Sequence, residues 1–195
     1  MGARLEVPVL VVGAGPVGMA ASILLAQQGI ASRVVERRAS VQRAPAAHVV
    51  NARSFEILRA AGVDGDASAA ACQDPADAGW VRWVTTLAGE ELGRLPFERQ
   101  GDDVRALTPT PLRSLSQHRL EPILLEQLRK QPEASVCFAH EWESATQDAH
   151  GVTSRVRDLE TGRIVEVRSR WLLAADGAGS RVRKALGIEP VGPAR

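Results

Sequence analysis

The spacing of hydrophobic residues over the first forty positions predicts a βαβ unit. A continuous apolar run over residues 7–12 is typical of a buried parallel strand. Apolar residues then recur at helical spacing over residues 16–28, and a second short apolar run covers residues 32–36. Gly29 follows the helical segment, at the position where a glycine commonly ends a helix. We therefore expect a strand, a helix and a second strand parallel to the first.

The rest of the chain predicts an inserted lobe and then a return to the first sheet. Helical spacing covers residues 52–61 and residues 117–130. Between them, residues 63–112 are rich in glycine, proline and aspartate, and residues 80–84 alternate like a half-exposed strand, which predicts an antiparallel lobe. Four strand candidates follow, at residues 136–138, 142–147, 152–159 and 163–175. Glycine-containing turns separate the last three, which predicts a three-stranded β-meander.

The last strand candidate ends in a second continuous apolar run. Residues 171–175 contain no polar side chain, a pattern typical of a strand that is buried on both faces. Asp176 and Gly177 stop the run, and a short helix is expected over residues 180–186. The fold class is therefore α/β, with a Rossmann-like βαβ core, a β-meander and an inserted antiparallel lobe.

Composition excludes several classes of protein. The 195 residues carry 24 basic and 23 acidic side chains, so no strong charge attracts nucleic acid or an anionic membrane. No stretch reaches the ~18 uncharged apolar residues that a membrane span requires. Cys72 and Cys137 are isolated in the sequence, and the four histidines form no metal-ligand pattern. We expect a cytoplasmic protein without a metal site, and without nucleic acid or membrane partners.

A glycine-rich turn joins the first strand to the first helix. Gly13 suits the tight turn, Gly15 allows a pyrophosphate to approach the backbone, and Gly18 allows the helix to pack closely on the sheet. Pro16 fits the first helical turn, where a missing N–H costs nothing. Glu36, eighteen residues after Gly18, ends the second strand and is placed to accept hydrogen bonds from a ribose. The turn predicts a dinucleotide site. It does not separate NAD from FAD, and a glycine turn without a ligand stays an alternative.

Three groups of residues together resemble the FAD-dependent aromatic-ring hydroxylases, the single-component monooxygenases with the p-hydroxybenzoate hydroxylase fold. The first group is the glycine turn with Glu36 and Arg37, and the second is residues 47–58. The third group couples residues 116–121 with residues 173–183, which contain the DG motif of that family. The resemblance spans nearly the whole chain in the expected order.

The resemblance implies a role for several residues. The three glycines would hold the FAD pyrophosphate, Glu36 would bind the adenosine ribose, and Gln117 would contact the flavin side of the cofactor. Asp176 of the DG motif is associated in the family with the use of both FAD and NAD(P)H. The expected cofactor-binding residues are Gly13, Gly15, Pro16, Gly18, Glu36, Arg37, Gln117 and Asp176. The sequence does not show which residues are catalytic.

The resemblance also implies a division of the chain and a function. Residues 1–62 would begin the FAD-binding core, residues 63–112 would form part of a substrate-side β lobe, residues 113–187 would return to the core, and residues 188–195 would be a linker-like tail. The implied activity is NAD(P)H-dependent hydroxylation of a phenolic or related aromatic compound with oxygen. The substrate itself and the choice between NADH and NADPH stay open.

Two departures from the family pattern leave alternatives open. Ala46 stands where the family commonly has an arginine, two positions before His48. No Gly-Asp-Ala-Ala-His type of motif follows the DG motif, whereas family members continue into one. The chain is therefore expected to be the amino-terminal part of such an enzyme, completed by a carboxyl-terminal half or a second chain. The alternatives are a truncated or split FAD-binding module without turnover, and an NAD-binding dehydrogenase or reductase.

Overall fold

The computed structural model describes residues 4–63, 65–97 and 102–192, which form two compact units. The first unit combines residues 1–42 with residues 124–195, and the second comprises residues 43–123. Helix α5 (Gln117–Arg129) contains the boundary between them. The two units are described in turn.

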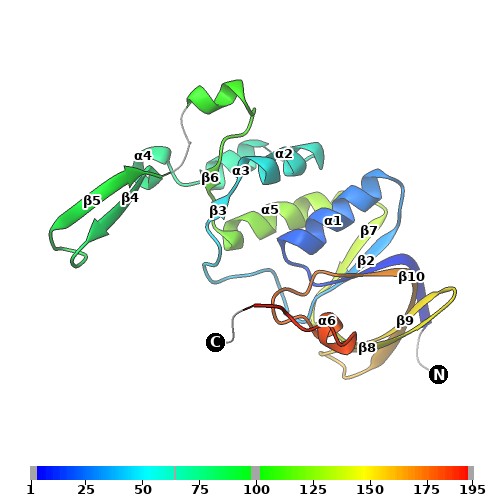
Figure 1. Cartoon of the computed structure of the whole chain (residues 1–195). Coiled ribbons are helices and arrows are strands. Elements are labelled where there is room, and N and C mark those ends of the chain that lie inside the picture. The colour runs from blue at the N-terminus through cyan, green and yellow to red at the C-terminus, as the bar shows by residue number, and fades with distance from the viewer. Residues whose placement is uncertain (1–3, 64, 98–101, 193–195) are drawn as a thin grey trace. The chain divides into compact units, whose positions relative to one another are not determined.

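A six-stranded sheet forms the centre of the first unit (Figure 1). Its strand order is β7-β2-β1-β10-β9-β8. The strands are β1 (Arg4–Val12), β2 (Ser32–Val35), β7 (Ala134–Cys137), β8 (His140–Asp148), β9 (Gly151–Asp158) and β10 (Ile164–Ala174). The first four strands of the order pair in parallel, whereas β10, β9 and β8 pair antiparallel. The predicted Rossmann-like core and three-stranded meander are confirmed.

Helix α1 (Pro16–Gln27) connects β1 to β2 and has a buried side. Met19 and Ile23 of this helix are fully buried, as are Leu10 and Val11 of β1. The buried hydroxyl groups of Ser22 in α1 and Ser32 in β2 form a hydrogen bond of 2.5 Å. Each fully buried aliphatic side chain contributes roughly 1.5–3 kcal/mol to folding. These apolar positions explain why the first forty residues fold as predicted.

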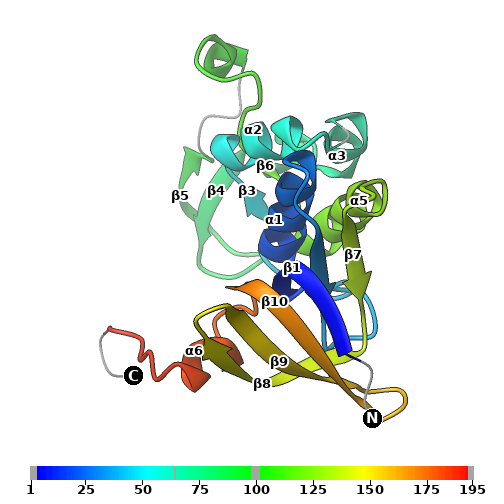
Figure 2. The ribbon, with the colours of Figure 1, turned by 90° about the vertical axis from the view of Figure 1, so that its right-hand side faces the viewer.

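The meander bends around a second part of the core. Trp142 of β8, Val156 of β9 and Val167 of β10 pack in one buried cluster with Val182 of helix α6 (Arg181–Ala185). The indole N–H of Trp142 donates to the buried Ser154 hydroxyl at 3.2 Å. Figure 2 shows α6 beside this curved part of the sheet. The same cluster contains Leu10 and Val12 of β1, so the meander, α6 and β1 share one core.

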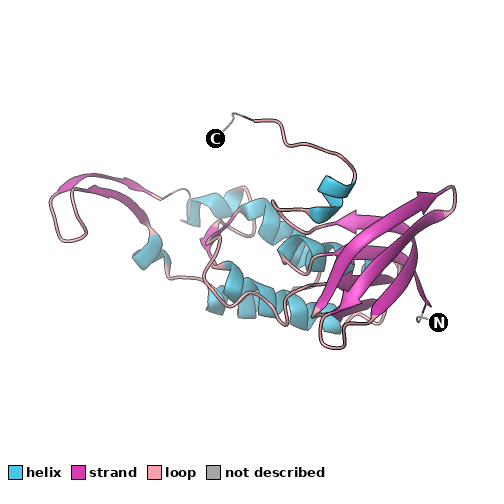
Figure 3. Cartoon of the chain, turned by 90° about the horizontal axis from the view of Figure 1, so that it is seen from below, coloured by secondary structure: helices cyan, strands magenta, loops and turns pink. Residues whose placement is uncertain are grey.

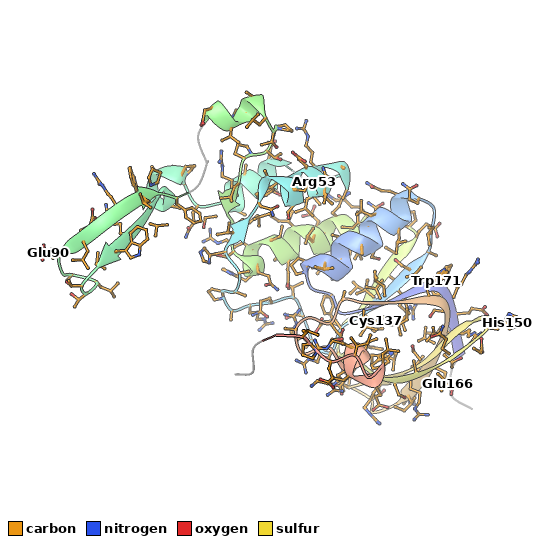
Figure 4. All side chains as sticks on the ribbon, viewed as in Figure 1. Arg53, Glu90, Cys137, His150, Glu166 and Trp171 are labelled. Carbon is orange, nitrogen blue, oxygen red and sulfur yellow. The ribbon has the colours of Figure 1, made fainter. Side chains whose placement is uncertain are left out.

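The apolar end of β10 is exposed, so the prediction that residues 171–175 are buried on both faces is wrong for this chain. Trp171 and Leu173 are 64% and 39% exposed (Trp171 is labelled in Figure 4). They pair with Val9 and Val11 of β1, which are 6% and 0% exposed. The physical reason is that β10 continues past the start of β9, so that beyond Ser169 only its β1 side has a paired strand among the described residues.

The second unit contains short helices and two small antiparallel pairs. Its helices are α2 (Ala52–Ala60), α3 (Gly65–Ala71), α4 (Pro75–Ala78), the 3-10 helix η1 (Asp102–Ala106) and the start of α5. Its strands are β3 (Val49–Val50), β4 (Trp80–Val84), β5 (Glu91–Pro96) and β6 (Arg113–Ser114). Strand β3 pairs with β6, and β4 pairs with β5 as a hairpin (strands in magenta in Figure 3). The sequence analysis expected the hairpin region to be antiparallel, but it did not predict α3, α4, β3 or β6.

Local hydrogen bonds explain where α2 begins and what holds it. The Asn51 side chain accepts the Ser54 backbone N–H at 2.8 Å, an arrangement that satisfies an otherwise free donor at the helix start. Phe55 and Leu58 are the buried residues of α2. The Thr108 hydroxyl donates to Glu56 at 2.7 Å and ties the helix to the segment before β6.

Two kinds of feature are absent from the residues that the structure describes. Among them, no helix is long and apolar enough to cross a membrane. The same residues contain no group of three or more His, Cys, Asp or Glu side chains that could hold a metal ion.

Candidate cofactor-binding site

The glycine turn between β1 and α1 is held together by close backbone contacts. Gly13 has a φ of +105°, a conformation that residues with a Cβ rarely adopt. A Cβ on Gly13 would overlap the Ala175 carbonyl oxygen and lie 3.0 Å from the Cα of Asp176. A Cβ on Gly18 would overlap the Gly13 carbonyl oxygen. Both glycines are therefore required by packing inside the first unit.

Gly15 differs from these two glycines because the space beside it is open. Apart from Gly15 itself and its two chain neighbours, no described atom lies within 4 Å of the position that its Cβ would take, and its φ of −75° is ordinary. Gly15 is also the N-cap of α1, and no side chain caps the helix start. Pro16 occupies the first helical turn, as predicted. The helix therefore presents backbone N–H groups and the positive end of its dipole beside open space, which fits a pyrophosphate.

Glu36 follows β2 and contacts the glycine turn. One carboxylate oxygen, Oε2, accepts the Ala14 backbone N–H at 2.9 Å. The other oxygen, Oε1, accepts both the backbone N–H and the side-chain Nε–H of Arg38, at 2.9 Å and 3.0 Å. Glu36 is 7% exposed. The carboxylate is thus fixed at the carboxyl ends of β1 and β2, where open α/β sheets bind nucleotides.

The ionisation of Glu36 follows from the same contacts. Burial raises the pKa of the Glu36 carboxyl, but the hydrogen bonds from Arg38 and Ala14 outweigh burial and hold this pKa below its usual value. Arg38 also donates to the Gln42 side chain at 2.6 Å. Arg37, which the sequence analysis selected, has an exposed side chain. The sequence analysis selected Arg37 rather than Arg38, although an arginine two residues after an acid at a strand end was a usable signal for a contact with Glu36.

Asp176 lies at the end of β10 and is bound to the start of α6. Its Oδ1 accepts the Ser180 hydroxyl at 2.6 Å, and its Oδ2 accepts the backbone N–H groups of Arg181 and Val182 at 2.7 Å and 3.3 Å. Ser180 itself caps the helix by accepting the Arg183 N–H at 2.9 Å. The carboxylate therefore shapes the turn of the DG motif by capping α6.

The turn of the DG motif lies against the glycine turn. The Ala175 N–H donates to the Val12 carbonyl at 2.8 Å, and the Gly13 N–H donates to Val35 at the end of β2 at 2.8 Å. The carboxyl ends of β1, β2 and β10 are thereby joined. The first unit brings together five of the predicted residues, namely Gly13, Gly15, Gly18, Glu36 and Asp176, with Pro16 at the adjoining helix start.

Gln117 belongs to the second unit, where it begins α5. Its backbone N–H donates to the Ala47 carbonyl at 2.8 Å, and its side-chain NH₂ donates to Glu121 at 2.6 Å. The His48 carbonyl accepts the Ser114 hydroxyl at 3.2 Å, next to the β3–β6 pair. The second unit therefore brings together residues 47–58 and 116–121, two of the segments on which the family resemblance rests. The His48 side chain is exposed.

The first unit defines a class of protein: a Rossmann-like dinucleotide-binding fold with a glycine turn, an acidic residue after β2 and a DG turn after β10. Comparison with known proteins identifies the family. A family model described as an FAD binding domain matches residues 6–195. The chain belongs to this family, and its relatives are FAD-dependent aromatic monooxygenases. The resemblance that the sequence analysis found is confirmed.

Curated relatives include two phenol-oxidising enzymes. The chain is 36% identical to 2,4-dichlorophenol 6-monooxygenase of Delftia acidovorans over 189 residues, which cover 94% of this chain and 32% of that protein. It is 34% identical to phenol 2-monooxygenase of Pseudomonas sp. strain EST1001 over 186 residues, which cover 93% of this chain and 30% of that protein. The chain thus spans about a third of the length of the curated relatives it matches.

Solved structures show the same fold. The flavin-dependent monooxygenase PieE, in complex with FAD and substrate, matches 94% of this chain with a TM-score of 0.86 and 38% sequence identity. Aklavinone-11 hydroxylase, in a ternary complex with FAD and aklavinone, matches 94% of this chain with a TM-score of 0.80 and 35% identity. The chain covers 32% and 35% of these two proteins.

Proposed function

We propose that this chain binds FAD through the glycine turn, with the pyrophosphate at the start of α1. The observation that carries this proposal is the open space at Gly15 beside an uncapped helix start, because it offers backbone N–H groups to an anion. Glu36 is proposed to accept hydrogen bonds from the adenosine ribose. Ala14 and Arg38 hold its carboxylate in place.

We propose roles for the three remaining predicted residues as well. Gln117 contacts the flavin half of the cofactor, and Asp176 acts by shaping the turn that adjoins Gly13. Arg37, with its exposed side chain, is proposed to meet the cofactor phosphates. Arg38 acts indirectly, by orienting Glu36.

The proposed activity is NAD(P)H-dependent hydroxylation of a phenolic or related aromatic compound, with this chain as the amino-terminal part of the enzyme. FAD supplies the redox chemistry when bound, passing electrons from NAD(P)H to oxygen, while the protein binds, orients and shields. The support is the family and the relatives, which include a dichlorophenol and a phenol monooxygenase. The second candidate is an FAD-binding module without turnover of its own.

One experiment separates these candidates. The purified chain is dialysed against equal concentrations of FAD and NAD⁺, and its absorption spectrum then identifies the retained cofactor. Phenol-stimulated NAD(P)H oxidation is assayed on the same sample. Retained FAD with stimulated oxidation supports the monooxygenase, and retained FAD without oxidation supports the module. Retained nicotinamide without flavin would refute both.

We also propose that the exposed end of β10 is covered by further polypeptide, from a carboxyl-terminal part or a second chain. The backbone N–H and C=O groups of successive residues in a strand point alternately to its two edges. The Ala175 N–H bonds to β1, so the backbone groups of Leu172 and Ala174 point to the opposite edge of β10. Beside this edge lies a cavity of about 740 Å³, with Trp142 and Trp171 in its lining. Unpaired strand edges and apolar surface favour association.

A cytoplasmic location is part of the proposal. Cys72 and Cys137 are both free in the structure, as thiols are in a reducing compartment.

A further inference from the structure

A fully buried carboxylate lies one helical turn after Gln117. Glu121 is 0% exposed, which is rare for an acidic side chain and costs free energy unless hydrogen bonds compensate the burial. Its Oε1 accepts the Gln117 Nε2–H at 2.6 Å, a short bond of the kind that charged acceptors form. The two residues are four positions apart on α5 and therefore face the same side of the helix.

This bond decides which end of the Gln117 amide is available to a ligand. A carboxylate only accepts hydrogen bonds, so the NH₂ group of the glutamine must face Glu121. The amide carbonyl oxygen, Oε1, then points away from Glu121 and remains an acceptor. The backbone of Gln117 is fixed as well, through its N–H bond to Ala47 at 2.8 Å. Rotation of the amide is thus restricted at both ends of the residue.

We propose that Glu121 is a positioning residue, which orients Gln117 so that its carbonyl oxygen accepts a hydrogen bond from an O–H or N–H donor on the flavin half of the cofactor. The inference rests on the proposed FAD site. It adds that, in one contact, Gln117 is the acceptor and the cofactor is the donor. Glu121 itself touches no cofactor in this account. Its effect on binding passes through Gln117.

The test is a double-mutant cycle on the 195-residue chain, with FAD affinity measured by quenching of flavin fluorescence. Glu121→Leu and Gln117→Leu are each expected to weaken FAD binding by about tenfold, the loss typical of a hydrogen bond to a charged or oriented group. The double variant should bind FAD no more weakly than Gln117→Leu alone. Glu121→Gln, which keeps an acceptor oxygen, should lose roughly threefold or less. Additive losses in the double variant, or full affinity in Glu121→Leu, would overturn the proposal.

Glu126→Gln is the matched control. Glu126 lies on the same helix, is 71% exposed and forms an ion pair of 2.8 Å with the exposed side chain of Lys130. Its substitution should leave FAD affinity unchanged.

A second measurement needs no cofactor and stays informative if Glu121→Leu does not fold. In the ligand-free wild-type chain, NMR should show slower hydrogen exchange for the Gln117 side-chain NH₂ than for that of the exposed Gln28. Equal exchange rates would overturn the positioning role. If the Gln117 amide exchanges slowly in a chain that binds no FAD, the positioning by Glu121 stands, whereas the proposed FAD site is refuted.

Discussion

The Oε2 atom of Glu36 lies 2.9 Å from the backbone nitrogen of Ala14, and this hydrogen bond joins the end of β2 to the glycine turn. The turn and the acidic residue are 22 positions apart in the sequence. Their contact means that one carboxylate both supports the fold of the turn and lies where a ribose is expected. Substitutions of Glu36 should therefore change stability and cofactor affinity together.

We predict that Glu36→Gln lowers the free energy of unfolding by about 1–3 kcal/mol, because a buried charge-assisted hydrogen-bond acceptor is lost. FAD affinity should fall by roughly tenfold, since a neutral amide is a weaker acceptor for ribose hydroxyls. Urea unfolding and FAD titration measure the two effects. Glu160→Gln, at an exposed position in the turn before β10, should change neither. A Glu36→Gln chain with wild-type values in both assays would contradict the account.

The stability of the first unit should depend on pH through Glu36. Its pKa in the folded chain lies below the ordinary value of 4.5 because the bonds from Arg38 and Ala14 outweigh burial. A lowered pKa gives stability that is fully present above pH 4.5 and is lost as pH falls through the folded pKa. Urea midpoints measured from pH 7 to pH 3 should therefore decline less in Glu36→Gln than in the wild type. Parallel declines would show that Glu36 does not contribute.

Gly13 and Gly15 should respond differently to the same substitution. Gly13→Ala places a Cβ at a φ of +105° and against the Ala175 carbonyl, so we expect a loss of about 1–3 kcal/mol in stability or a failure to fold. Gly15→Ala places a Cβ in open space at an ordinary φ, and we expect stability to change by less than about 1 kcal/mol, because the weaker N-cap offsets the lower entropy of the unfolded chain. Thermal melts compare the two. Equal destabilisation would contradict the geometry of the turn.

Asp176→Ala should destabilise α6 by about 0.5–2 kcal/mol, because the carboxylate accepts two backbone N–H groups at the helix start. Hydrogen exchange of the amides of residues 181–183 should become faster, whereas the amides of β1 should exchange as before. Asp74→Ala, which removes the cap of α4 in the other unit, is the control and should leave α6 unchanged. Unchanged exchange in α6 after Asp176→Ala would refute the capping role.

The exposed apolar end of β10 should cause association of the isolated chain. Trp171 and Leu173 are 64% and 39% exposed, and we expect sedimentation velocity to show association that increases with concentration. Replacing both residues by serine should reduce the association and change stability by less than about 1 kcal/mol. A wild-type chain that is monomeric at every concentration would contradict this prediction.

The sequence was sufficient to predict the core of the first unit, because strong local signals and packing agree there. The apolar runs of β1 and β2, Pro16 at the helix start and the glycine after α1 each specify one element. The positive φ of Gly13 suits the tight turn that the glycine predicted, whereas the contact between this turn and Ala175 depends on the pairing of β1 with β10. The family resemblance then identified FAD as the expected cofactor.

Other features depended on contacts between distant segments and could not be predicted. The exposure of Trp171 depends on where β9 begins, which the apolar run itself does not encode. The two-residue strands β3 and β6 pair across more than sixty positions and are too short for a periodic signal. The bond between Glu36 and the Ala14 backbone joins the end of β2 to the glycine turn across 22 positions, and no local pattern encodes it. In each case the sequence does not show which strand or residue is the contact partner.

The central claim is that FAD binds at the glycine turn, and equilibrium titration of FAD into the wild-type chain and Gly15→Ala tests it most directly. We predict saturable binding of one FAD per wild-type chain. Binding to Gly15→Ala should be at least about tenfold weaker, because its Cβ projects where the pyrophosphate is proposed to approach, while the variant stays folded. Equal FAD affinity for the two folded chains, or no binding of FAD by the wild type, would contradict the account.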